Sequence, residues 1–115
     1  MQGFGLDADR LAQLRVFSAA ERHAIAKGVA SAIIDQLQRL ERALASSDLA
    51  TVADAAHQAR NETLLVGARS LTNALADLER AARGGERELA RAAAQQVKAI
   101  WPAAHAAIDE IAAGG

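Results

Sequence analysis

The sequence predicts an all-α protein, an up-down antiparallel four-helix bundle with a short N-terminal cap helix. Roughly a quarter of the residues are alanine and there is a single proline, a composition that favours helix. Apolar residues recur every three or four positions along four long segments. Short connections between these segments make consecutive helices antiparallel neighbours. A chain of 115 residues is long enough for one core, so we expect residues 1–115 to form a single domain.

Start and stop signals divide the chain into five expected helices. Asp7 or Asp9 can cap the first helix, and Ser18-Ala19-Ala20-Glu21 is a capping box for the second. Ser46-Ser47-Asp48 ends the second helix and caps the third. Gly67 permits a sharp turn after the third helix, and Gly84-Gly85 ends the fourth. The expected ranges are about 7–17, 18–45, 48–65, 68–83 and 86–112.

Composition and charge exclude several classes of function. The net charge is −1 with both signs interspersed, so there is no basic patch of the kind that nucleic-acid binding requires. The absence of cysteine excludes disulfides and thiolate metal sites, and the three histidines form no helical His-x-x-x-His pair. No apolar run approaches the length of a membrane span. We therefore expect a cytoplasmic protein that binds no membrane, no nucleic acid and no cofactor of its own.

One histidine lies among residues suited to phosphoryl chemistry. On a helix, His57 shares a face with Asp54, Arg60, Asn61 and Leu64. A neutral imidazole supplies a nitrogen nucleophile near pH 7, and a guanidinium one turn away can neutralise phosphoryl oxygens. The apolar stripe of the same helix is centred on Ala56, Ala59 and Thr63, which places His57 at or beyond the edge of the core. A surface histidine without a function is the ordinary interpretation of such a position.

The wider segment resembles the histidine-containing phosphotransfer (HPt) domain family of multistep two-component phosphorelays. In that family a lysine follows the histidine at +3, a glycine at +4, a small residue at +5 and a second glycine at +10. Here Arg60 and Gly67 occupy the +3 and +10 positions. Ser46-Ser47-Asp48-Leu49 and Leu78-Glu79-Arg80 also resemble segments of the family. The resemblance extends from about residue 11 to residue 108 and includes the predicted bundle.

Two positions depart from the family pattern. Asn61 stands at +4 in place of glycine, and Glu62 stands at +5 in place of a small residue. Asn61 either narrows the approach to the imidazole or hydrogen-bonds its Nδ1, which would fix the tautomer that leaves Nε2 nucleophilic. Asp54 could orient the ring from the other side.

The resemblance implies a phosphorelay intermediate that carries a phosphoryl group on His57 between receiver-domain aspartates, with Arg60 stabilising the phosphate. The implied partners are receiver domains of response regulators and a hybrid sensor histidine kinase. Mg²⁺ is expected on the partner receiver domain, and this chain is expected to be a monomer without kinase activity. Leu64, Ile34 and Gln58 are the expected partner-binding residues, because an apolar patch beside the histidine is what a receiver would cover.

Other interpretations remain open. The run from His57 to Asn61 also resembles the H-box of histidine kinase dimerisation domains, but no glycine-rich phosphate loop accompanies it, so we expect no autophosphorylation. One alternative is a non-phosphorylated adaptor that docks on and inhibits a receiver or a histidine kinase. Another is an interaction bundle with no signalling role.

Overall fold

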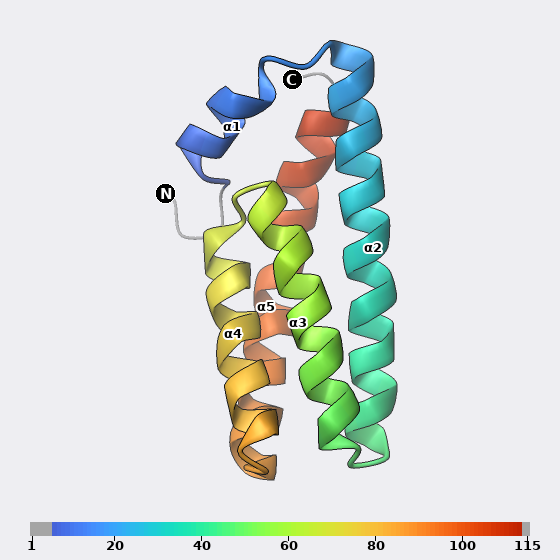
Figure 1. Ribbon diagram of the computed structural model, residues 1–115, viewed down its shortest axis with the longest axis vertical. Helices are drawn as coiled ribbons and strands as arrows, with labels where there is room; N and C mark the ends of the chain where they lie inside the picture. Colours follow the sequence, from blue (N-terminus) through green and yellow to red (C-terminus); the bar gives the residue numbers. More distant parts are fainter. Residues whose placement is uncertain (1–5, 114–115) are drawn as a thin grey trace.

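The computed structural model describes residues 6–113, which form five α-helices and no strand (Figure 1). The helices are α1 (Ala8–Leu14), α2 (Ala19–Ala45), α3 (Leu49–Leu65), α4 (Arg69–Arg83) and α5 (Arg87–Ala112). The all-α prediction is confirmed, and the four long helices match their expected ranges to within one residue. Along the described part of the chain, no helix is both long and apolar enough to cross a membrane.

The first three helices begin at the capping residues that the sequence indicates. Asp7 rather than Asp9 is the N-cap of α1, and its carboxylate accepts a hydrogen bond from the Asp9 backbone N–H at 2.8 Å. Ser18 and Glu21 form the reciprocal capping box at the start of α2, with N···O distances of 3.1 and 2.7 Å. Asp48 caps α3 through its side chain. Each cap satisfies backbone N–H groups that have no partner within the helix.

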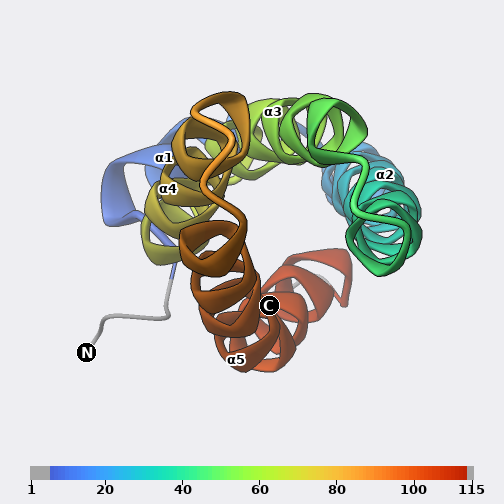
Figure 2. The same ribbon diagram turned by 90° about the horizontal axis from the view of Figure 1, so that it is seen from below.

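The four long helices pack in a ring. α2 contacts α3, α3 contacts α4, α4 contacts α5, and α5 contacts α2 (Figure 2). The α3–α4 seam therefore lies on the opposite side of the molecule from the α2–α5 seam. Aliphatic side chains and alanines fill the interior between the helices, as the near absence of aromatic residues requires. The largest fully buried side chains in the core are Ile33, Leu71, Leu75, Leu78, Ile108, Val52, Val66 and Val97.

Gly67 connects α1 to the turn between α3 and α4. Its φ is +69°, a conformation that glycine adopts without steric cost. A Cβ at this position would lie 2.6 Å from the Cβ of Asp7 and 2.8 Å from the Cβ of Arg10. The Gly67 carbonyl accepts a hydrogen bond from the Asp7 backbone N–H at 2.7 Å, and the Asp7 carboxylate pairs with Arg69. The turn glycine thus also permits the close approach of α1.

Candidate functional site

His57 lies on α3 at the seam with α4, and 39% of its side chain is exposed. Arg60 follows it by three residues, so the two side chains lie on neighbouring parts of the same helix surface. Glu79 reaches the histidine from α4 across the seam. The apolar stripes of α3 and α4 face the core, and this places the three polar side chains at its edge.

Glu79 is the least exposed member of the group, with 12% of its side chain accessible. Its carboxylate accepts a hydrogen bond from Nε of Arg83 at 3.0 Å and forms an ion pair with Nη2 of the same residue at 2.9 Å. Burial raises the pKa of the Glu79 carboxyl, but the hydrogen bond from Arg83, the contact with His57 and the positive charge of Arg60 outweigh this effect. The pKa of Glu79 is consequently held below its ordinary value. The seam therefore contains an ionised carboxylate at neutral pH.

The two nitrogens of the His57 ring have different surroundings. Nδ1 lies 3.2 and 3.3 Å from the two carboxylate oxygens of Glu79 and 3.0 Å from Nη2 of Arg60. Nε2 forms no hydrogen bond with any residue between 6 and 113. The structure thus holds the ring at one nitrogen and leaves the other available to an incoming group.

The residue that orients the ring differs from those expected. Within the described chain neither Asn61 nor Asp54 hydrogen-bonds His57; Asn61 is exposed, and the Asp54 carboxylate lies 3.9 Å from Nη2 of Arg83. Glu79 contacts Nδ1 instead. Same-helix spacing finds only neighbours on α3, whereas Glu79 comes from the next helix. The only sequence signal for it was the resemblance of Leu78-Glu79-Arg80 to a family segment.

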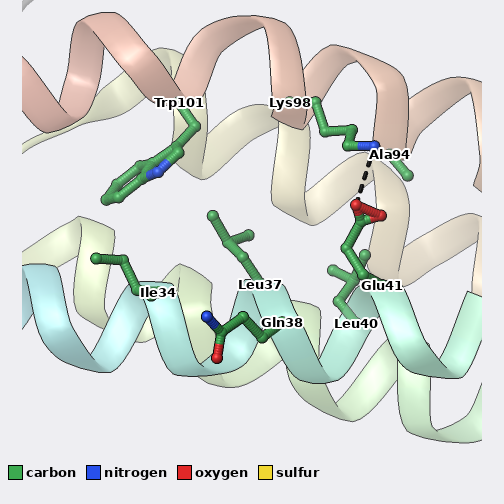
Figure 3. Close-up of a pocket in the computed structure, with 8 residues that line it drawn as sticks. All are labelled: Ile34, Leu37, Gln38, Leu40, Glu41, Ala94, Lys98 and Trp101. Atoms are coloured by element: carbon green, nitrogen blue, oxygen red, sulfur yellow. Dashed lines mark ion pairs between the residues drawn. The ribbon is translucent and has the colours of Figure 1, made fainter.

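The expected partner-binding residues fall on two sides of the molecule. Leu64 is 52% exposed, and both Leu64 and Gln58 lie on α3 with the histidine. Ile34 instead lines a groove of about 350 Å³ at the α2–α5 seam, together with Leu37 and Trp101 (Figure 3). That seam is opposite the one that holds His57, so the expectation that Ile34 belongs to a patch around the histidine is wrong.

The other histidines have different surroundings. His23 on α2 contacts the Ala112 carbonyl through Nδ1 at 2.6 Å. His105 stacks on Trp101 with ring centroids 4.7 Å apart, and its Nε2 lies 3.7 Å from Asp109. Between residues 6 and 113, no group of three or more His, Asp or Glu side chains is arranged to hold a metal ion. The α3–α4 seam is where a histidine, a carboxylate and two guanidinium groups come together.

Comparison of the chain with protein-family models, with curated proteins and with solved structures found no match.

Proposed function

We propose that this protein is a phosphorelay intermediate that carries a phosphoryl group on His57 between the aspartates of receiver domains. The observation that supports this most strongly is the unequal environment of the imidazole. An ionised carboxylate faces Nδ1, and Nε2 makes no hydrogen bond to the described chain. A carboxylate at one ring nitrogen stabilises the tautomer whose other nitrogen is a nucleophile.

The transfer step follows from this arrangement. The Nε2 lone pair attacks the phosphorus of a receiver's aspartyl phosphate, the Nε2–P bond forms, and the P–O bond to the aspartate breaks. The aspartate leaves as a carboxylate. The ring retains its Nδ1 proton and becomes positively charged, and Glu79 compensates that charge across a distance of 3.2 Å. The return transfer to a second receiver runs through the same atoms in reverse.

The two guanidinium groups have separate roles in this proposal. Arg83 pairs with Glu79 at 2.9 Å and helps to keep the carboxylate ionised. Arg60 is partly exposed and offers a planar fork of donors that matches phosphoryl oxygens. Mg²⁺ would be contributed by the receiver, as the HPt resemblance implies, so this chain supplies a positioned nucleophile and Arg60.

The proposed architecture is an up-down antiparallel four-helix bundle with α1 as its cap, in a cytoplasmic, monomeric, single-domain protein. Short connections between the long helices and the ring of helix contacts support it. Receivers would dock over His57, Gln58 and Leu64, since Leu64 presents exposed apolar surface two turns along the same helix face from the histidine. Docking should be weak, because a shuttle must release each partner.

The test is transfer of a radioactive phosphoryl group from a phosphorylated receiver domain, using a panel of receivers. The wild-type chain should acquire acid-labile, alkali-stable label, and His57→Gln should acquire none. His23→Gln and His105→Gln are matched controls that should be labelled as the wild type is. A receiver that binds the chain without transferring label would contradict the shuttle and favour the adaptor. Absence of both binding and labelling across the panel would leave the interaction bundle.

A further inference from the structure

Nδ1 of His57 lies within hydrogen-bonding distance of a donor and an acceptor at once. Nη2 of Arg60 is 3.0 Å away, and the carboxylate oxygens of Glu79 are 3.2 and 3.3 Å away. A neutral imidazole has one N–H and one lone pair. Nδ1 can therefore accept from Arg60 or donate to Glu79, and each contact requires the opposite tautomer of the ring.

The two tautomers differ in reactivity at Nε2. When Nδ1 accepts from Arg60, the ring proton is on Nε2, and the lone pair that would attack phosphorus is absent. When Nδ1 donates to Glu79, Nε2 carries the lone pair and is nucleophilic. We propose that Arg60 opposes the preference of Glu79 for the nucleophilic tautomer: it holds Nε2 protonated in the free protein, and a docked phosphoryl group draws the guanidinium away, after which Glu79 determines the tautomer. The inference rests on the proposed phosphotransfer function.

Two observations support Arg60 as the group that moves. Its contact with Nδ1 is the shortest of the three contacts at that atom. In this position the Arg60 Nε is buried and has no hydrogen-bond partner among residues 6–113. An unsatisfied buried N–H is unfavourable, and a phosphoryl dianion is a stronger acceptor than a neutral imidazole nitrogen. Arg60 thus gains hydrogen bonds when it turns from the ring to the phosphoryl oxygens.

The proton balance of the switch is simple. When Arg60 leaves, Nε2 releases its proton to solvent and Nδ1 takes up one proton, which it shares with Glu79. The net charge of the ring does not change. The nucleophile is then formed only while a phosphoryl group is present, which limits reaction of the free protein with other electrophiles.

The test is ¹⁵N NMR of the imidazole, which distinguishes the two tautomers by the chemical shifts of Nδ1 and Nε2. Spectra are collected over a pH titration so that the neutral ring is observed. The wild type should show mainly the Nε2–H form. Arg60→Met, and Arg60→Ala as a second variant, should show mainly the Nδ1–H form. The ratio should change by about tenfold or more, the size expected when a hydrogen bond to a charged group is lost.

Arg80→Met is the matched control, because it removes from the same helix a guanidinium that pairs with Asp77 and, within the described chain, contacts neither the ring nor Glu79. Its tautomer ratio should equal that of the wild type. An Nδ1–H form in the wild type, or an unchanged ratio in both Arg60 variants, would overturn the inference. Neither result depends on phosphorylation, so failure of the switch is distinguishable from failure of the proposed function, which the labelling of His57 decides.

Discussion

Replacing Glu79 with glutamine removes the negative charge that faces Nδ1 of His57 while it preserves the size of the side chain. The proposed transfer step places a positive charge on the ring, 3.2 Å from that carboxylate. Glu79→Gln should therefore slow phosphorylation of His57 more than it changes the fold. The amide can still accept a hydrogen bond from Nδ1, so the variant isolates the loss of charge.

The size of the effect follows from Coulomb's law. Two unit charges about 3 Å apart interact by roughly 1 kcal/mol in bulk water and roughly 5 kcal/mol at an effective dielectric constant of 20. His57 is partly exposed, and the guanidinium groups of Arg60 and Arg83 offset some of the carboxylate's charge. We therefore expect a loss of about 1.5–3 kcal/mol in transition-state stabilisation, which is roughly ten- to a hundredfold in rate.

The assay is the single-turnover rate of phosphorylation of His57 by phosphoramidate, a small donor that needs no docking surface. Asp77→Asn is the matched control, because it makes the same acid-to-amide change on α4 at an exposed residue that pairs with Arg80. The control should react at the wild-type rate. Thermal unfolding of each variant checks that the fold is retained. Equal rates for Glu79→Gln and the wild type would refute the role assigned to the carboxylate.

Three further predictions concern the turn at Gly67, the cap of α1 at Asp7 and the exposed Asn61 beside the histidine. Gly67→Ala should lower the free energy of unfolding by about 2 kcal/mol or more, because it combines a positive φ with a Cβ only 2.6 Å from that of Asp7; an unchanged urea midpoint would contradict this. The pKa of the Asp7 carboxyl is lowered, first by the hydrogen bond from the Asp9 backbone N–H and then by the pairing with Arg69. The ionised carboxylate therefore stabilises the fold above pH 3.8, the ordinary pKa, and this contribution is lost as the pH falls through the lower pKa of the folded state. Over that range, the protection of the α1 amides against hydrogen exchange should fall in the wild type and should depend less on pH in Asp7→Asn. Parallel protection profiles for the two proteins would contradict the link between Asp7 and α1. Asn61→Gly should speed transfer from a phosphorylated receiver, because Asn61 is exposed and makes no hydrogen bond to the ring within the described chain. The same change should destabilise the helix by about 1 kcal/mol or less. Slower transfer would show that the asparagine takes part in the reaction.

The helices could be predicted because their signals are local. Ser18 with Glu21, and Asp48, mark helix starts through side-chain contacts three residues away, and Gly67 marks a turn through its backbone freedom. The periodic apolar residues then determine which face of each helix is buried. These relations involve residues close in sequence, so they can be read without knowing how the helices pack.

Only the part of the site that comes from one helix could be predicted, because sequence spacing relates residues that are close along the chain. Arg60 lies one turn from His57 and could be placed beside it by spacing alone. Glu79 is 22 residues away and meets the ring only because α3 packs against α4. The prediction that Ile34 lies beside the histidine was wrong for the same reason, since the position of Ile34 on α2 does not reveal whether it faces α3 or α5. The sequence pattern gives the faces of a helix, but the pairing of faces is a property of the packed bundle.

The proposed phosphotransfer requires that Nε2 of His57 accept the phosphoryl group. The most direct measurement is ³¹P and ¹⁵N NMR of the chain after transfer from a phosphorylated receiver domain. We expect a single phosphohistidine at His57, bonded through Nε2, with Nδ1 still protonated beside Glu79. A phosphoryl group on Nδ1 of His57, or on His23 or His105, would contradict it.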